Sequence, residues 1–363
     1  MYLRHLKLAN FKSYSEAEFD FCAKINAIIG ENGSGKTNLL DAIHYLSFCK
    51  SYFLPQDSLS IQFECDFFAI HGEFVRPGLG QDTKVSCTFK SPGRKVMKAN
   101  QKEYQLLSDH IGQFPLIMIS PYDNDIIHDG SEVRRKFFDM IISQFDKEYL
   151  RKLISYQKIL SQRNALIKQF IEQRQFNWSL IQVFDMQMVA PCQYIFEKRK
   201  SYLESIISHF NHCYGFLSND KENVDIKYES GLLYQTYDEG IIQCETADRK
   251  SGHTNFGIHK DDFIFTINNR PIKKIGSQGQ QKSFAIALKL AQYDYIYSQK
   301  KVKPILLLDD IFDKLDLQRI QRLLELVGKA EIGQVFITDT SVSRVKEILG
   351  THGIENKIFT ITR

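Results

Sequence analysis

The chain has 363 residues, of which 43% are hydrophobic and 25% are charged, and its formal net charge is +4 at pH 7. This composition excludes a collagen-like or disordered chain, and the weak positive charge permits nucleic acid as a partner without requiring it. The length predicts two domains, or one large domain with a sizeable insertion.

The cysteines and the first residues indicate the compartment. Seven cysteines are present, but they form no Cys-x-x-Cys pair, so neither a zinc ribbon nor a disulfide framework is expected. The opening "MYLRHLKLAN" carries charge and lacks the apolar core of a signal peptide. No run approaches the roughly 20 apolar residues that a membrane span requires. We therefore expect a cytoplasmic protein in a reducing compartment, with no membrane contact.

The first third of the chain is predicted to be rich in strands. Residues 2–29 contain two strand-like stretches, "YLRHLKLANF" and "KINAIIG". Apolar residues then recur at helical spacing from residue 37, so a helix should follow the glycine-rich stretch. Residues 60–120 contain the runs "FFAIHGEF", "KVSCTF" and "FPLIMIS", separated by turn formers. These three runs are predicted to be strands of an antiparallel meander.

After residue 131 the predicted secondary structure changes twice, first to helices and then back to alternating helices and strands. Residues 132–218 have apolar residues at helical spacing but no sustained heptads, which predicts a compact inserted α-helical lobe rather than a coiled coil. The α/β pattern then resumes, with helices near 279–297 and 316–326 and strands in "PILLLDD" and "QVFIT". We predict an α/β fold in which residues 1–131 and 219–363 form one head. The head should contain a sheet whose first and last strands in sequence are neighbours in space.

The glycine-rich stretch "IIGENGSGKT" fits the pattern G-x-x-x-x-G-K-[ST] between a strand and a helix. Glycines let backbone N–H groups approach anionic oxygens, Lys36 supplies a positive charge, and Thr37 offers a hydroxyl to Mg²⁺. The helix amino end adds its partial positive charge. A simple glycine turn is the alternative, and the complete spacing disfavours it. The predicted nucleotide-binding residues are Gly30, Glu31, Asn32, Gly33, Ser34, Gly35, Lys36 and Thr37.

The apolar strand in "KPILLLDDIFDKLD" ends in two carboxylates, Asp309 and Asp310. Two unpaired carboxylates at a buried strand end are costly without a cation. We therefore predict that Asp309 holds Mg²⁺, while Lys36 and Asp310 are catalytic and Asp310 orients the attacking water. A strand capped by acids at the surface is the alternative. Because Asp is one methylene shorter than the Glu often found at the second position, we expect slow ATP hydrolysis that works as a timer.

The stretch "IGSQGQQKSFAIALKLAQ", residues 275–292, begins with a Ser-x-Gly-Gln turn that should cap a long helix. A capped core helix is the plain alternative. The stretch resembles the signature motif of the ATP-binding-cassette (ABC) class, whose serine and glycine bind the γ-phosphate of ATP held by a second protomer. The resemblance implies that Ser277, Gly279 and Gln280 act in trans, and that two copies form a homodimer around two ATP molecules.

Four further stretches resemble a single family. They are "LRHLKLANFKSY", "SPYDNDIIHDGSEVRRKFFD", "YQKILSQRNALIK" and "SGHTNFGIHKDDF", spread over nearly the whole chain. They are similar to stretches of the RecF family, bacterial recombination mediators of the SMC-like ATPase group. The resemblance implies an ABC-type P-loop ATPase head with an antiparallel β-meander and an inserted α-helical lobe. It also implies a slow, DNA-dependent ATPase that binds gapped or single-strand/double-strand junction DNA and helps RecO and RecR to load recombinase in repair and replication restart.

Two positions differ from the pattern of that group, and a third allows two interpretations. SMC-like relatives place a Mg²⁺-sensing Gln near Pro121, and this sequence offers Asp123 there. The histidine that follows the last strand in such relatives is replaced in "FITDTS", where Asp339 or Thr340 would face the γ-phosphate. Lys12, in "NFKSY", is either a nucleotide contact or an ordinary surface lysine.

Basic residues gather in four groups that are either DNA contacts or ordinary solvated charges. They are Lys90, Arg94, Lys95 and Lys98; Arg134, Arg135 and Lys136; Lys198, Arg199 and Lys200; and Arg270, Lys273 and Lys274.

Two rival functions use the same phosphate loop. An ABC-type transporter ATPase subunit would need a membrane protein as its partner, which the β-meander and the helical lobe fit poorly. A small-molecule kinase or a GTPase would lack the Ser277 turn. A GTPase would also need an Asn-Lys-x-Asp sequence, which is absent from this chain.

Overall fold

The structure is a computed structural model that describes residues 1–77, 82–311, 318, 319, 321, 322, 325, 332–341 and 355–362. Its contacts divide the chain into two compact units. Unit 1 comprises residues 1–123, 216–220 and 278–363, and unit 2 comprises residues 124–215 and 221–277. The helix expected near residues 316–326 lies largely outside the described residues.

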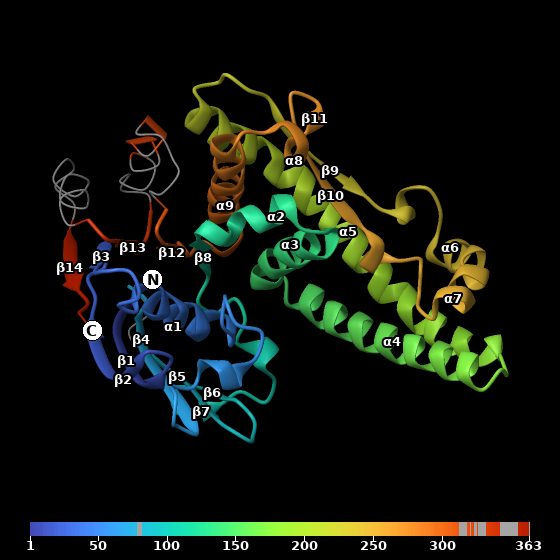
Figure 1. Cartoon of the computed structure of the whole chain (residues 1–363), viewed down its shortest axis with the longest axis horizontal. Helices are drawn as coiled ribbons and strands as arrows, with labels where there is room; N and C mark the ends of the chain where they lie inside the picture. Colours follow the sequence, from blue (N-terminus) through green and yellow to red (C-terminus); the bar gives the residue numbers. More distant parts are fainter. Residues whose placement is uncertain are drawn as a thin grey trace. The chain divides into compact units, whose positions relative to one another are not determined.

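A five-stranded parallel sheet runs through unit 1 (Figure 1). Its strands, in spatial order, are β14 (Asn356–Thr360), β3 (Ile25–Ile29), β13 (Val335–Asp339), β12 (Ile305–Leu308) and β8 (Leu116–Ile119). Every residue of β3, β8, β12 and β13 is buried, which explains why these strands are mostly apolar runs without alternation. The run "FPLIMIS" supplies β8, which pairs in parallel with β12, so its assignment to the meander is wrong.

The meander is a separate six-stranded antiparallel sheet. Its strands, in spatial order, are β2 (Tyr14–Asp20), β1 (Tyr2–Phe11), β4 (Phe67–Val75), β5 (Thr83–Lys90), β6 (Val96–Ala99) and β7 (Lys102–Glu103). The last strand of the chain, β14, pairs in parallel with β3, so the first and last strands in sequence of the parallel sheet are neighbours, as expected. The side-chain amide of Gln334 connects the two sheets, because it exchanges two hydrogen bonds of 2.7 Å with the backbone of Leu3.

Two long helices of unit 1 carry the predicted motifs at their amino ends. They are α1 (Lys36–Phe48) and α9 (Gln278–Lys300), and both are largely buried. α1 contacts strands of both sheets, and α9 contacts β8. Short 3₁₀ helices of the N-terminal segment are η1 (Asp57–Ser60), η2 (Leu107–Asp109) and η3 (Pro121–Asn124).

Unit 2 combines helices with a three-stranded antiparallel sheet. The helices are α2 (Asp125–His128), α3 (Ser131–Phe145), α4 (Lys147–Glu172), α5 (Trp178–Ser218), η4 (Gly231–Leu233), α6 (Tyr237–Gln243), α7 (Glu245–Ser251), η5 (Ile258–Lys260) and α8 (Ile272–Ile275). The strands, in order, are β11 (Arg270–Pro271), β10 (Asp262–Ile267) and β9 (Val224–Glu229). None of the helices that the structure describes has both the length and the apolar character to cross a membrane.

The lobe region extends beyond the stretch expected from helical periodicity. That periodicity corresponds to α3, α4 and α5, but residues 221–277, which the prediction places in the head, belong to unit 2. The reason is that β10 packs on α3, where the rings of Phe138 and Phe263 stack with their centroids 3.8 Å apart.

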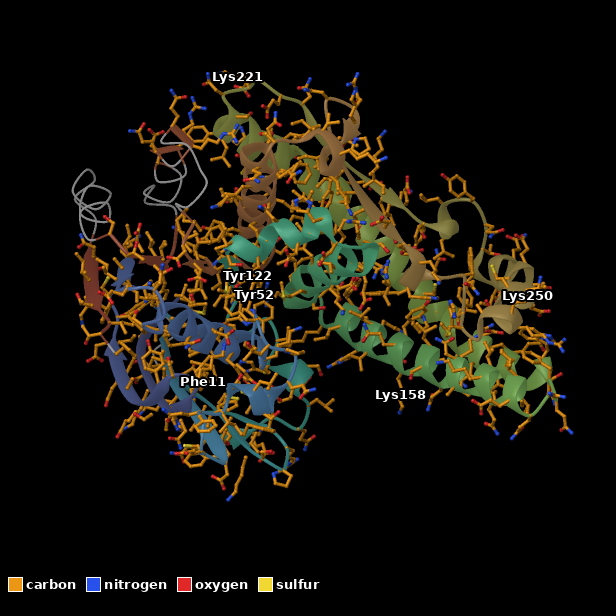
Figure 2. All side chains as sticks on the ribbon, viewed as in Figure 1. Phe11, Tyr52, Tyr122, Lys158, Lys221 and Lys250 are labelled. Carbon is orange, nitrogen blue, oxygen red and sulfur yellow. The ribbon has the colours of Figure 1, made fainter. Side chains whose placement is uncertain are left out.

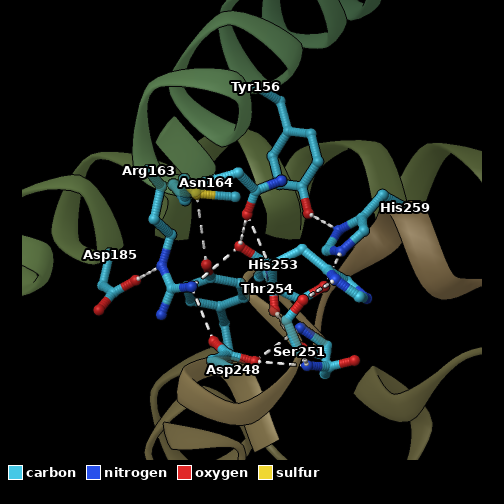
Figure 3. Close-up of polar contacts among 12 residues, drawn as sticks. Tyr156, Arg163, Asn164, Asp185, Asp248, Ser251, His253, Thr254 and His259 are labelled. Carbon is cyan, nitrogen blue, oxygen red and sulfur yellow. Dashed lines mark hydrogen bonds and ion pairs between the residues drawn. The ribbon is translucent and has the colours of Figure 1, made fainter. Parts of the chain in front are cut away.

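Arg163 of α4 organises a buried polar cluster in unit 2 (Figure 3). Its guanidinium donates hydrogen bonds to Asp185 (2.6 Å), Asp248 (2.7 Å) and Thr254 (2.9 Å). Thr254 also bonds the side-chain oxygen of Asn164, the residue after Arg163. The stretches "YQKILSQRNALIK" and "SGHTNFGIHKDDF" therefore meet in the fold, and the second of them is a structural loop packed on α4.

His259 in the same loop is held as a neutral side chain (Figure 3). Burial lowers the pKa of its imidazole to about 4. Nε2 lies 3.0 Å from the carbonyl oxygen of Thr254, which can only accept, so Nε2 carries the proton. Nδ1 then accepts from the hydroxyl of Tyr156 at 2.7 Å.

Candidate nucleotide-binding site

The glycine-rich loop lies between β3 and α1, as the sequence predicts. Gly33 and Gly35 have φ angles of 80° and 108°, in the left-handed region that other residues rarely adopt. A Cβ added to Gly30 would lie 2.5 Å from the carbonyl oxygen of Ile361 and 2.6 Å from Ser34 Oγ. The loop is therefore a tight backbone turn at the amino end of α1, which fits the phosphates of a nucleotide.

Lys36 is the first residue of α1, and its ammonium group is buried in the loop. Nζ donates to the carbonyl oxygens of Gly30 and Glu31, both at 2.9 Å. An ammonium group has three N–H donors, so one more is available for a phosphate oxygen. Ser34 Oγ is also buried, and it has no hydrogen-bond partner among the residues that the structure describes. A positive charge and an unsatisfied hydroxyl thus both lie within the loop.

Thr37 and Asp309 meet at the edge of the parallel sheet, although 272 positions separate them in the sequence. Thr37 Oγ1 donates to the two carboxylate oxygens at 3.0 and 3.1 Å, and Thr338 Oγ1 donates to Oδ1 at 2.9 Å. Asp309 is only 2% exposed. Burial raises the pKa of its carboxyl to about 6, against the opposing effect of the two hydroxyl donors.

This pair fits Mg²⁺ because a bound cation would favour the desolvated carboxylate. Across the described parts of the chain, no group of three or more His, Cys, Asp or Glu side chains is placed to hold a metal ion. Mg²⁺ bound by Thr37 and Asp309 would therefore need phosphate oxygens and water to complete its coordination, as it does in many nucleotide sites.

Asp310 occupies a strained turn at the end of β12. Its φ angle is 43°, which is uncommon for a residue with a side chain, and such outliers concentrate at functional sites. Its backbone N–H donates to Thr338 Oγ1 at 2.9 Å. Its side chain is partly exposed, whereas that of Asp309 is buried. The turn therefore separates two adjacent carboxylates into different environments.

Thr338 is a site residue that no sequence motif indicated. The sequence indicated Asp339 or Thr340 at this end of β13, whereas in the structure Asp339 Oδ1 accepts from the backbone N–H of Ser341 at 2.7 Å and Thr340 is exposed. Thr338 instead bonds the Asp309 carboxylate and the Asp310 backbone. Only the parallel pairing of β12 with β13 brings it there.

The turn between β1 and β2 supports the loop. Tyr14 donates its hydroxyl to the carbonyl oxygen of Gly35 at 3.0 Å, a contact that the sequence did not indicate. Lys12 forms an ion pair of 2.6 Å with Asp41 of α1, and its side chain is 10% exposed. Lys12 is therefore not an ordinary surface lysine, because it neutralises a buried carboxylate behind the phosphate loop.

Asp123, the expected counterpart of the Mg²⁺-sensing Gln, is buried in η3. Its oxygens accept from the hydroxyl of Tyr52 at 2.6 Å and from the backbone N–H of Ser120 at 2.7 Å. Lys289 of α9 lies 3.2 Å away. Asp123 is thus connected to α9 rather than presented to solvent.

The predicted signature residues stand at the start of α9. Ser277 directly precedes the helix and is exposed, and Gly279 and Gln280 belong to its first turn. Ile275, two residues before Ser277, is 49% exposed. In Figure 1 the first turn of α9 is the part of this helix farthest from α1.

Most of the basic residues considered for DNA contact are engaged within the protein. Ion pairs hold Lys90 to Asp66, Arg94 to Glu103, Lys95 to Asp57, Arg134 to Asp262, Lys136 to Glu132, Lys198 to Asp146, and Arg199 to Asp139 and Asp261. Arg135 and Lys273 donate to backbone carbonyls. Arg199 is almost completely buried and is not available to DNA. Lys98, Lys200, Arg270 and Lys274 are exposed and have no ion pair with a described residue.

Comparison with known proteins identifies the family. The family described as RecF/RecN/SMC N terminal domain matches residues 2–358. The chain is 45% identical over 361 residues to the DNA replication and repair protein RecF of Flavobacterium johnsoniae, and the match covers 99% of this chain and 100% of the relative. The chain belongs to the RecF family.

Two solved structures support the fold assignment. They are described as the recombination mediator protein RecF with ATPrS and with ATP in the RecFOR pathway. Each has a TM-score of 0.88 against 99% of this chain, with identities of 31% and 30%, and the matches cover 96% and 95% of those chains. The predicted ABC-type, SMC-like fold is confirmed. RecF-family membership disfavours the transporter subunit.

Proposed function

We propose that this chain is an ATP-dependent DNA-binding protein that acts in recombinational repair and replication restart. In this proposal it dimerises on ATP and separates after slow hydrolysis. The observation that carries the proposal is the contact between Thr37 and Asp309, beside a glycine loop that fits phosphate. The solved RecF structure with ATP, at 30% identity over nearly the whole chain, supports ATP as the nucleotide.

The chain's own residues divide the work of the site. Lys36 and the loop N–H groups bind the phosphates, and Thr37 and Asp309 hold the Mg²⁺ that neutralises phosphate charge. Asp310 orients the attacking water, because its side chain is the partly exposed carboxylate of the pair. Its short side chain supports slow hydrolysis.

The signature turn would complete the site of a second copy. Ser277 is exposed at the amino end of a long helix, where its hydroxyl and the helix N–H groups can bond a γ-phosphate. The exposed Ile275 beside it suits an interface. In a two-fold dimer each copy would contribute one glycine loop and one Ser277 turn to each ATP.

Sizing in ATP and in ADP tests this dimer. We expect Mg²⁺-ATP to produce a dimer of the natural chain and ADP to leave a monomer. Ser277→Arg should remain monomeric in ATP while binding nucleotide normally, because the arginine blocks the turn. Asp310→Asn should bind ATP and stay dimeric for longer, because hydrolysis is slowed.

Ser205→Arg is the matched control, since Ser205 is another exposed serine and lies on α5. It should dimerise like the natural chain. If Ser277→Arg dimerises as well as Ser205→Arg does, the turn does not act in trans.

DNA binding would depend on the exposed basic residues Lys98, Lys200, Arg270 and Lys274, whose side chains can pair with DNA phosphates. Affinity should be independent of sequence and fall steeply with salt. The relative is named a DNA replication and repair protein, and the solved structures are described as a recombination mediator in the RecFOR pathway, which supports DNA, RecO and RecR as partners. We propose that the chain acts at gapped or junction DNA, where it helps to load recombinase.

A double substitution, Arg270→Glu with Lys274→Glu, tests the DNA surface. If both side chains bind phosphates, the slope of log affinity against log salt should fall by about 2, because each lost contact removes about 0.9. The control is Lys158→Glu with Lys250→Glu, which changes the charge equally at two exposed lysines labelled in Figure 2. Equal slopes for the two double variants would show that Arg270 and Lys274 do not contact DNA.

A further inference from the structure

A buried lysine in the middle of α9 is an unusual feature of unit 1. Lys289 is 2% exposed, and a buried ammonium group is costly unless it is paired and hydrogen-bonded. Its Nζ lies 3.2 Å from Asp123 Oδ1 and donates to the carbonyl oxygen of Met118 at 2.8 Å and to Tyr52 Oη at 3.3 Å. The ammonium group also lies 5.4 Å from the centroid of the Tyr52 ring.

Tyr52, Asp123 and Lys289 form a closed set of contacts, which we call the triad. The Tyr52 hydroxyl donates to Asp123 at 2.6 Å and accepts from Lys289. Each pair within the triad is in direct contact, so the three side chains define one another's positions. The bond from the Tyr52 hydroxyl to the Asp123 carboxylate is short, as charge-assisted hydrogen bonds inside a protein are.

One end of the triad reaches the phosphate loop through α1. The backbone N–H of Tyr52 donates to Asp41 at 2.7 Å. Asp41 lies one helical turn after Thr37, on the same face of α1. Lys12 and Ser51 bond the same carboxylate at 2.6 and 2.7 Å. The position of Tyr52 is thus set by the helix that carries the phosphate-binding residues.

The other end reaches the signature turn through α9. Lys289 lies about three turns after Ser277 along a continuous helix. Asp123 is the last residue of unit 1 before the chain first enters unit 2, and α9 begins where the chain returns from unit 2 for the last time. Within unit 1, the triad therefore links the end of the first segment, at Asp123, to the helix that begins the last segment.

We propose that Tyr52, Asp123 and Lys289 are positioning residues that couple nucleotide binding at the loop to the placement of the signature turn. This inference rests on the proposed function, because it assigns the triad a role in ATP-driven dimerisation. The contacts that define the triad run to α1 and along α9, and not to the phosphates' own ligands in the loop. Breaking it should weaken dimerisation and leave the affinity of the monomer for ATP unchanged.

Tyr52→Phe is the most conservative test, because it removes one hydroxyl and keeps the ring beneath Lys289. We expect the protein concentration for half-dimerisation in Mg²⁺-ATP to rise about tenfold, the effect of losing one hydrogen bond to a charged group. Lys289→Met should act in the same direction. ATP affinity, measured on the monomer at low protein concentration, should stay at the natural value for both.

Tyr45→Phe is the matched control. Tyr45 is a buried tyrosine of α1 whose hydroxyl also bonds a carboxylate, that of Asp57, but this contact leads to η1 and the β-meander rather than to α9. Tyr45→Phe should lower thermal stability to a similar extent and leave dimerisation within about twofold of the natural value. If Tyr52→Phe and Lys289→Met shift dimerisation no more than Tyr45→Phe does, the triad is only structural and the inference is wrong.

A second measurement separates this inference from the dimer proposal. In the Ser277→Arg background no dimer is expected, so any effect of ATP on α9 is transmitted within one chain. We expect Mg²⁺-ATP to slow amide hydrogen exchange in the first turns of α9, and Tyr52→Phe to abolish that slowing. If ATP leaves exchange in α9 unchanged in Ser277→Arg, coupling through the triad is refuted, whether or not the natural chain dimerises.

Discussion

Asp309→Asn should abolish ATP hydrolysis and at the same time stabilise the nucleotide-free protein at neutral pH. Hydrolysis should fall below about a hundredth of the natural rate, because the substitution removes the charge that holds Mg²⁺ and so several kcal/mol of transition-state stabilisation. The gain in stability follows from burial, which raises the pKa of this carboxyl from 3.8 to about 6. The natural protein therefore keeps a desolvated negative charge above pH 6.

The sign of the pH dependence follows from proton binding. Between pH 3.8 and about 6 the folded state holds this proton more tightly than the unfolded state, so stability is lost as pH rises through that window. Above about pH 6, the charged carboxylate lowers the free energy of unfolding by about 3 kcal/mol. The uncharged amide of Asp309→Asn would escape this penalty while still accepting the two hydroxyl bonds. The gain should be measurable by urea unfolding at pH 7.5 and should vanish near pH 4.

Asp310→Asn is the control for this prediction. It makes the same chemical change at the next residue, where the side chain is partly exposed and Asn tolerates the left-handed backbone. It should slow hydrolysis without stabilising the protein. Equal urea midpoints for Asp309→Asn and the natural chain at pH 7.5 would contradict the account of a desolvated carboxylate.

Arg199→Met should destabilise unit 2 by about 3–5 kcal/mol, because it leaves buried carboxylates without their cation. Arg199 is 1% exposed, and its guanidinium bonds both oxygens of Asp139 at 3.0 Å and one oxygen of Asp261 at 2.8 Å. These contacts join α5 to α3 and to the start of β10. Removing the arginine therefore affects the packing of three elements together.

The chain supplies its own probe for this measurement. Its one tryptophan, Trp178, begins α5 and packs against Phe176, so its fluorescence reports on unit 2 during denaturant unfolding. Arg94→Met is the control, because the Arg94–Glu103 pair is at the surface and should contribute less than about 1 kcal/mol. Adding Asp139→Asn and Asp261→Asn to Arg199→Met should recover part of the loss. A midpoint for Arg199→Met equal to that of Arg94→Met would refute the account of the buried pair.

The sequence by itself determined the local features of this protein. The loop at residues 30–37, the strand that ends in Asp309 and Asp310 and the helix that follows Ser277 were all predictable, because each depends on residue order over a few turns. The RecF-like stretches also identified the family, which the comparisons confirm.

The tertiary structure alone decided which distant side chains meet. Thr338 reaches Asp309 only because β12 and β13 are neighbours, and "FPLIMIS" becomes β8 of the parallel sheet because a run buried on both faces has no alternation to reveal its partner. Charge clusters were misleading for the same reason. Arg199 and Lys198 are adjacent in the sequence, yet one is buried between carboxylates and the other is at the surface. Strand pairing and ion pairing join residues far apart in the chain, so their energies leave no local pattern in the sequence.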